Sequence, residues 1–188
     1  INVAGEAVYK DRGLLEKIGR EDFRFVGIQL HYLLERMDES LGIYQKQILR
    51  SKRHFEEIGN LMSIPGIGYI QAAKIVSQVV APGRFPNKYK YYSYCGLIRH
   101  KQESGQRRYG TVRVWGNRTL KCVYKMAGHS AIKGTSALRK YYDHLRSKGL
   151  DDNKAYNAVC RKIAAISLSI WRNNKKYDDS LVSNDLIK

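Results

Sequence analysis

Apolar residues recur at steps of three and four between residues 22 and 57, the spacing that places side chains on one face of an α-helix. The opposite face carries charged residues such as Glu35, Arg36 and Lys46. The pattern predicts one long helix, with two interpretations open: a coiled-coil arm that forms a dimer contact, or a helix packed on its own domain. The apolar stripe consists of Val26, Leu30, Leu33, Met37, Leu41, Tyr44 and Ile48.

The segment Ile64-Pro65-Gly66-Ile67-Gly68 follows, and apolar periodicity then resumes over residues 69–80. This order predicts a tight turn that leads into a helix, similar to the hairpin of a helix-hairpin-helix element. Glycines allow the backbone to approach a phosphate, and the N–H groups that open the next helix can bind it. Pro65, Gly66 and Gly68 are therefore candidate DNA contacts, although a plain turn between two helices requires similar residues.

Residues 84–118 have little helical periodicity, and residues 111–115 alternate as a short strand does. Helical patterns return at about 117–131, 136–147 and 152–173, with Ser136 and Asp151 as candidate N-caps. The predicted fold is mainly α: a long, coiled-coil-like helical arm, then a compact helical domain with a helix-hairpin-helix-like element and a basic loop or short β-hairpin. The expected divisions are a helical linker over 1–57, the compact domain over 58–178, and a polar, frayed tail over 179–188.

The charge of the chain indicates which kind of partner it binds. The chain has 34 Lys and Arg against 17 Asp and Glu, a net charge of +17. Residues 84–125 alone hold eleven cations and one acid, interleaved with aromatic residues that suit nucleotide stacking. We predict nucleic-acid contact here. The aromatic residues are Tyr89, Tyr91, Tyr92, Tyr94, Tyr109 and Trp115, and the candidate contacts are Arg84, Lys88, Lys90, Arg99, Lys101, Arg107, Arg108, Arg113, Asn117 and Arg118.

Several classes of protein are disfavoured by composition. The longest apolar run is far shorter than the roughly 18–20 residues that cross a bilayer, and residues 1–20 have no signal-peptide pattern. The three cysteines form no CxxC pair and the five histidines do not cluster, which argues against a disulfide framework and a zinc site. We expect no membrane partner, no cofactor in this part of the protein and a reducing, cytoplasmic setting. The start at Ile1 suggests a fragment.

Ser104 and Gly105 lie inside the basic segment. A serine hydroxyl needs an activating partner and nearby positive charge to attack a phosphate, and Arg107, Arg108 and Arg113 are candidates to supply that charge. Glycine after the serine permits a tight backbone and an open approach. Ser-Gly is nevertheless common in turns, so the spacing by itself does not identify a catalytic serine.

An ordered set of motifs extends over about residues 58–178. The motifs are Leu61-x-x-Ile64-Pro65-Gly66-Ile67-Gly68, Arg84-Phe85-Pro86, Tyr94-Cys95-Gly96-Leu97, Ser104-Gly105, Gly110, Gly116-Asn117-Arg118-x-Leu120 and Tyr177-Asp178. In this order they resemble the C-terminal domain of insertion-sequence-110 transposases, the group that includes pilin-gene invertases. The chain departs from the family pattern at Gln106 and at Trp115.

The resemblance implies a DNA recombinase in which Ser104, followed by Gly105, is the nucleophile that becomes joined to DNA. It also implies a structured guide RNA, a homo-oligomer, and an N-terminal RuvC-like domain with acidic residues and Mg²⁺. No such acidic site is visible in this sequence, so the chain alone is expected to cut DNA poorly. The helical stripe suggests a dimer through the arm, and the family suggests a tetramer.

Three other interpretations compete with this one. A non-enzymatic helix-hairpin-helix DNA-binding module explains the turn and the charge, but not the Ser-Gly pair in the basic segment. A tyrosine recombinase is disfavoured because His144 and Arg146 are too close together for its usual His-x-x-Arg pair. A structural RNA-binding protein predicts strong RNA binding without a preference for DNA.

Overall fold

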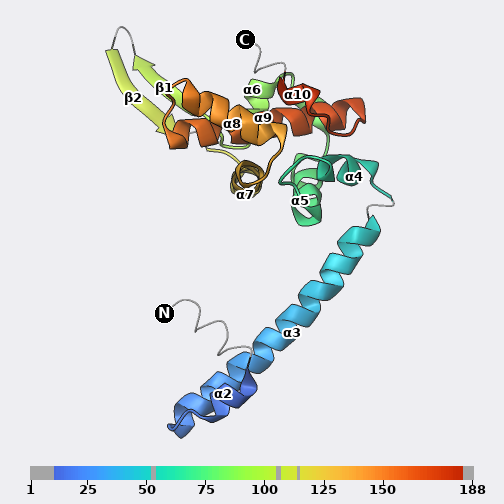
Figure 1. The fold of residues 1–188 in the computed structure, drawn as a ribbon, viewed down its shortest axis with the longest axis vertical. Helices are drawn as coiled ribbons and strands as arrows, with labels where there is room; N and C mark the ends of the chain where they lie inside the picture. The colour runs from blue at the N-terminus through green and yellow to red at the C-terminus, as the bar shows by residue number, and fades with distance from the viewer. Residues whose placement is uncertain (1–10, 52–53, 105–106, 114, 184–188) are drawn as a thin grey trace. The chain divides into compact units, whose positions relative to one another are not determined.

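The computed structural model of the chain describes residues 11–51, 54–104, 107–113 and 115–183 (Figure 1). For residues 100–104, 107–109 and 111–113 the description is of the backbone. The chain divides between Leu49 and Arg50 into two compact units. Within these described ranges the first unit contains two helices, and the second is a helical domain that carries one two-stranded sheet.

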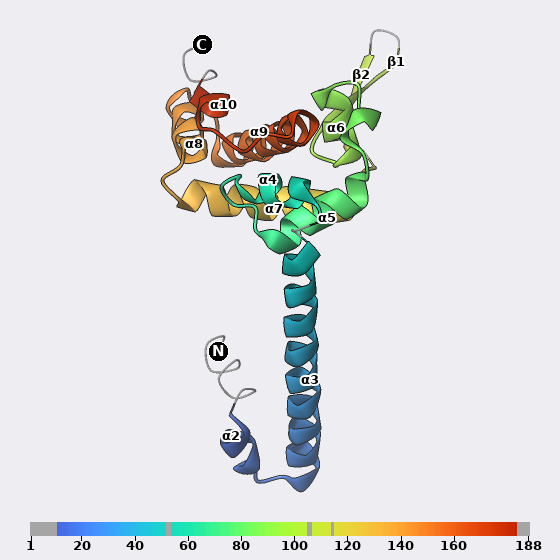
Figure 2. The same ribbon diagram turned by 90° about the vertical axis from the view of Figure 1, so that its right-hand side faces the viewer.

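In the first unit a short helix folds back on a long one. Helix α2 (Arg12–Glu16) begins at Asp11, whose carboxylate accepts a hydrogen bond from Gly13 N at 2.9 Å. Helix α3 (Glu21–Ser51) is 31 residues long, and α2 lies beside its first turns (Figure 2). Leu15 of α2 is buried, and a Cβ on Gly27 would lie 3.4 Å from its side chain. Gly27 therefore permits close approach of the two helices.

The predicted apolar stripe of α3 remains exposed. The exposed fractions are 57% for Leu33, 62% for Met37 and 68% for Tyr44. Val26, Leu30 and Leu41 are exposed as well. The helix predicted from the periodicity is confirmed, and the described residues of the first unit do not cover its stripe.

The helix predicted over residues 22–57 is too long at its C-terminal end. Helix α3 ends at Ser51, and a separate helix, α4 (Glu56–Met62), begins after Phe55, whose backbone is extended at φ −128° and ψ 90°. Glu56 and Glu57 occupy the first turn of α4, where the helix dipole stabilises acidic side chains. The apolar period continues across this break, so periodicity alone could not reveal it.

The second unit is a helical domain around α9 (Asp152–Asn173). Helix α9 packs against α4, α6, α7 and α8, and the hairpin of β1 and β2 extends beyond these helices (Figures 1 and 2). Asp151 caps α9 by accepting a hydrogen bond from Lys154 N, as predicted. The other elements are α5 (Tyr69–Val79), the 3₁₀ turn η1 (Pro82–Arg84), α6 (Lys88–Tyr94), β1 (Arg99–Ser104), β2 (Arg107–Arg113), α7 (Arg118–Lys133), α8 (Ala137–Ser147) and α10 (Ser180–Ser183).

Three sequence predictions for this unit need correction. Helix α6 forms inside the segment expected to be non-helical, because Asn87 accepts hydrogen bonds from two N–H groups of its first turn. Ser136 begins α8, but its hydroxyl makes no capping bond and lies buried without a partner among the described residues. Residues 180–183 form α10, and Val182 is fully buried, so this part of the chain is not a frayed polar tail.

A chain of three buried hydroxyl groups connects α6, α7 and α9. Tyr124 of α7 is bonded to the Tyr91 hydroxyl and, at 2.8 Å, to Ser167 Oγ, which in turn donates to Ala164 O. Burial raises the pKa of both tyrosines well above the ordinary value, and it raises the pKa of the neighbouring Cys95 thiol to about 12. These groups are therefore neutral and act in packing and hydrogen bonding.

Tyr124→Phe tests the contribution of this network. We expect the free energy of unfolding to fall by about 1–3 kcal/mol, because Tyr91 loses its buried partner in a region that water does not reach. Urea denaturation measures the change. Tyr89→Phe is the matched control, since the Tyr89 side chain is 63% exposed, and it should leave stability unchanged. Equal stability of the two variants would show that the network contributes nothing.

Candidate nucleic-acid interface

The basic segment forms an antiparallel hairpin with an irregular register. Pairing runs from Arg99 opposite Arg113 to Ser104 opposite Arg107, and the register shifts between Gln102 and Glu103. Strand β2 contains one extra residue at this shift, where Gly110 has φ 110°. Such a bulge bends a strand and strengthens its twist. The bulge thus sets the direction of the hairpin end that carries Ser104.

The backbones of Gly96 and Gly116 cross in close contact at the base of the hairpin. A Cβ on Gly116 would lie 2.7 Å from Gly96 Cα and 2.8 Å from Tyr94 O, so only glycine permits this crossing. Asn117 N also donates to Tyr94 O at 2.7 Å. The structure thereby brings together two motifs, at 94–97 and 116–118, that are twenty residues apart in the sequence. Their contact fixes where the hairpin leaves the helical domain.

Ser104 is the last residue of β1, and Arg107 is its partner position on β2. Because directly opposed residues share a face of a two-stranded ribbon, positions 104 and 107 lie on one face. The register places positions 99, 101, 108 and 113 on the other face. Of the three arginines proposed to support Ser104, Arg107 therefore has the closest register position. Gly105 lies outside the described residues.

The cations near α6 differ in whether they contact other parts of the protein. Arg84 lies 5.0 Å from the centre of the Tyr94 ring and donates to Val79 O at 3.4 Å, so it also stabilises the end of α5. Lys88 and Lys90 are exposed on α6. The interleaved aromatic residues divide similarly. Trp115 is 99% exposed and Tyr89 is exposed, whereas two of the expected stacking residues, Tyr91 and Tyr92, belong to the core.

Asn117 and Arg118 begin helix α7. The Asn117 side chain accepts a hydrogen bond from Leu120 N at 3.0 Å and donates to Gln78 Oε1 at 2.7 Å. The Asn117 side chain is therefore the N-cap of α7. This structural role explains why asparagine is present at position 117, and a contact with nucleic acid is not needed to explain it. Arg118 is exposed and lies beside Lys74 at a cavity of about 540 Å³.

The turn with Pro65 and Gly66 packs against α7. Gly66 has φ 90°, and a Cβ there would lie closer than 3.0 Å to Ala127 O. The glycine is thus required by helix packing, while Gly68 is exposed at the start of α5. Ala127 lies nine residues after Arg118, about 14 Å along α7, so the turn and the hairpin base lie at different places on this helix. Phosphate binding by the turn stays a prediction.

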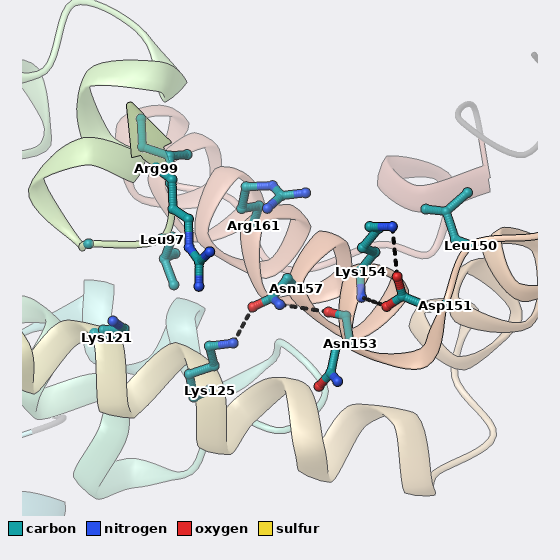
Figure 3. A pocket seen from close by; sticks show the side chains of 12 residues that line it. Leu97, Arg99, Lys121, Lys125, Leu150, Asp151, Asn153, Lys154, Asn157 and Arg161 are labelled. Atoms are coloured by element: carbon teal, nitrogen blue, oxygen red, sulfur yellow. Dashed lines mark hydrogen bonds and ion pairs between the residues drawn. The ribbon is translucent and has the colours of Figure 1, made fainter. Parts of the chain in front are cut away.

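A basic cavity at the hairpin base was not predicted from the sequence. It has a volume of about 920 Å³ and lies between α7 and α9 (Figure 3). Arg99 is the one residue on its wall that belongs to the predicted contacts. The other cations come from two helices, and within each helix their spacing places them on one face. Nothing in the local sequence indicates that these two faces lie opposite each other. These cations are Lys121 and Lys125 on α7, and Lys154 and Arg161 on α9.

The described residues show neither a metal site nor a membrane span. No three His, Cys, Asp or Glu side chains among them form a group that could hold a metal ion. The Mg²⁺ implied by the family resemblance does not fit any group of residues in this described part. No helix within the described ranges is long and apolar enough to cross a bilayer.

Comparison with known proteins assigns the domain that holds this interface. Residues 59–143, from within α4 through most of α8, match a family of transposases. The model that matches is that of the IS116/IS110/IS902 transposase family, in agreement with the resemblance noted in the sequence.

A curated relative supports the same assignment. The chain is 27% identical over 122 residues to a protein of Streptomyces coelicolor described as "Insertion element IS110 uncharacterized 43.6 kDa protein". The aligned region covers 64% of this chain and 30% of that relative. The chain therefore spans less than a third of the length of the relative that it matches.

Proposed function

We propose that this chain is part of a DNA transposase and supplies Ser104 as the nucleophile for strand cleavage and exchange. The observation that carries the proposal is the position of Ser104, at the end of β1 and opposite Arg107, in a basic hairpin of a transposase-family domain. The hairpin extends beyond the helices of the domain (Figure 1). The surrounding positive charge attracts that backbone.

The reaction that we propose is a transesterification. The Ser104 hydroxyl loses its proton and Oγ attacks a DNA phosphorus. The bond between that phosphorus and one strand oxygen breaks, and the oxygen leaves as a hydroxyl after it takes a proton. Ser104 then carries the phosphodiester to the other part of the strand. Arg107 is suited to stabilise the charge that develops on the phosphate oxygens. Reversal with a second strand end completes the exchange.

The partners in this proposal are DNA and a structured guide RNA. The excess of cations in residues 84–125 suits either nucleic acid, because both present a phosphate backbone. Mg²⁺ belongs to the RuvC-like part that the resemblance implies.

Trapping of the intermediate tests the proposed function. The full-length transposase that contains this chain is incubated with DNA carrying the ends of its element, denatured and digested, and the DNA-linked peptide is identified by mass spectrometry. We expect the link at Ser104. A link at another residue, or DNA binding with no covalent product, would exclude the proposed nucleophile. The second of these results would favour a DNA-binding module without catalytic function.

We also propose that the exposed stripe of α3 associates with a second copy of the arm. In Leu33→Glu/Met37→Glu we expect the dissociation constant of the oligomer to rise more than about a hundredfold, because each apolar side chain contributes roughly 1.5–3 kcal/mol when buried. Light scattering after gel filtration measures the mass. Lys46→Gln/Arg50→Gln changes the net charge equally on the polar face and should leave the mass unchanged. A monomeric wild-type protein would contradict the proposal.

A further inference from the structure

The cavity between α7 and α9 combines positive charge from three elements. Lys121 and Lys125 come from α7, Lys154 and Arg161 come from α9, and Arg99 is the first residue of β1. Figure 3 shows Arg99 reaching from the strand toward the space between the two helices. The wall formed by α9 lies beyond residues 59–143, so the family match does not include it.

Among the described residues that line the cavity, Asp151 is the one carboxylate, and it is already paired. Asp151 accepts a hydrogen bond from Lys154 N and pairs with Lys154 Nζ, each at 2.8 Å, and these contacts lower its pKa. Within the described part of the chain, neither Arg99 nor Arg161 has an acidic partner. Like charges that converge on one cavity repel each other, and a bound anion relieves that repulsion.

One cation of the cavity is held in position before any ligand arrives. The Lys125 ammonium lies 4.6 Å from the centre of the Tyr156 ring and donates to Asn157 Oδ1. The Tyr156 hydroxyl in turn donates to Lys125 O at 2.6 Å, which ties the two helices together at this point. A side chain that is already ordered loses less conformational entropy when it binds an anion.

The walls of the cavity favour phosphate over nucleobases. No aromatic side chain among the described residues lines it, so it provides no surface on which a base could stack. Guanidinium and ammonium groups are the side chains that bind phosphate oxygens most strongly. Ser104 lies five residues along β1 from Arg99, a distance of about 17 Å in an extended strand. One bound nucleic-acid segment of a few nucleotides can therefore occupy the cavity and reach Ser104.

We propose that this cavity binds the sugar-phosphate backbone of a nucleic acid at the base of the hairpin, through Lys121, Lys125 and Arg161 together with Arg99. The site rests on the proposed function, because it positions the strand on which Ser104 would act. It adds helix α9 to the nucleic-acid interface. Asp151 remains with the α9 N-terminus and Lys154, so the phosphates lie farther along the helix.

The salt dependence of binding tests this site. Fluorescence anisotropy is measured with the full chain, using a duplex DNA and an RNA hairpin with equal numbers of phosphates. For Lys121→Gln/Arg161→Gln we expect the slope of log affinity against log salt to decrease by about 1.8 for duplex DNA, since each lost phosphate contact removes roughly 0.9. At about 0.1 M salt this corresponds to a loss of affinity greater than roughly tenfold.

Two further variants make this result specific. Lys133→Gln/Lys140→Gln removes the same charge from exposed positions of α7 and α8 and should change the slope little. Arg161→Lys keeps the charge and should keep the slope. If circular dichroism shows that the double variant is unfolded, the single variant Arg161→Gln replaces it, with an expected decrease of about 0.9.

Each possible outcome either supports or contradicts the proposed site. A loss confined to DNA or to RNA identifies the nucleic acid that the cavity binds. Slopes equal to those of the charge-matched control for both ligands would overturn the site, even if a Ser104–DNA link is trapped. A reduced slope without any such link would keep the site and exclude the proposed nucleophile. A wild-type chain that binds neither nucleic acid would overturn both proposals.

Discussion

Replacing Ser104 by Ala should abolish the covalent DNA product while leaving DNA binding intact. We expect the amount of linked DNA to fall by at least about a thousandfold, because alanine has no oxygen to attack the phosphorus. The affinity for DNA should change by less than about twofold, since the cations supply most of it. Denaturing gels measure the linked product, and anisotropy measures binding with the same protein and DNA.

Ser77→Ala is the matched control for this experiment. Ser77 is exposed on α5, and its hydroxyl donates only to Lys74 O of its own helix, at 3.1 Å. The control should keep both the linked product and DNA affinity. Linked DNA at wild-type levels in Ser104→Ala would exclude Ser104 as the nucleophile. Equal loss of product and affinity would instead assign Ser104 to binding.

Gly66→Ala should produce the largest loss of stability among single substitutions in the turn before α5. Its φ of 90° is unfavourable for any residue with a Cβ, and that Cβ would collide with the backbone oxygen of Ala127. Backbone atoms of α7 cannot rotate away as a side chain can. We expect a decrease of more than about 3 kcal/mol in the free energy of unfolding, which lowers Tm by about 6–12 °C.

Gly83→Ala provides the comparison for Gly66→Ala. A Cβ at Gly83 would meet no atom within 4 Å, and its φ is not positive, so the change should stay within about 0.5 kcal/mol. Urea denaturation at neutral pH gives both values. A loss below about 1 kcal/mol for Gly66→Ala would show that the turn is not packed on α7 as described. The glycine would then be free for the phosphate contact predicted from the sequence.

Aromatic residues in the basic segment show where inference from the sequence was limited. Tyr91 and Trp115 both lie among cations in the sequence, and both were predicted to contact nucleotides. Tyr91 is instead buried against Phe85 and Tyr124, and Trp115 is almost fully exposed. A tyrosine is large enough for a core and polar enough for a surface, so the choice depends on which helix packs over it.

The sequence by itself determined the features that depend on neighbours along the chain. These are the long helix α3, helix α9 with its Asp151 cap, the positive charge of residues 84–125 and the motifs of the family. Periodicity, capping and charge act over a few residues, so they can be seen without a fold. The tertiary structure alone decided the crossing of Gly96 with Gly116 and the cavity shared by Lys125 and Arg161. Both arise from packing between segments far apart in sequence, which no local pattern encodes.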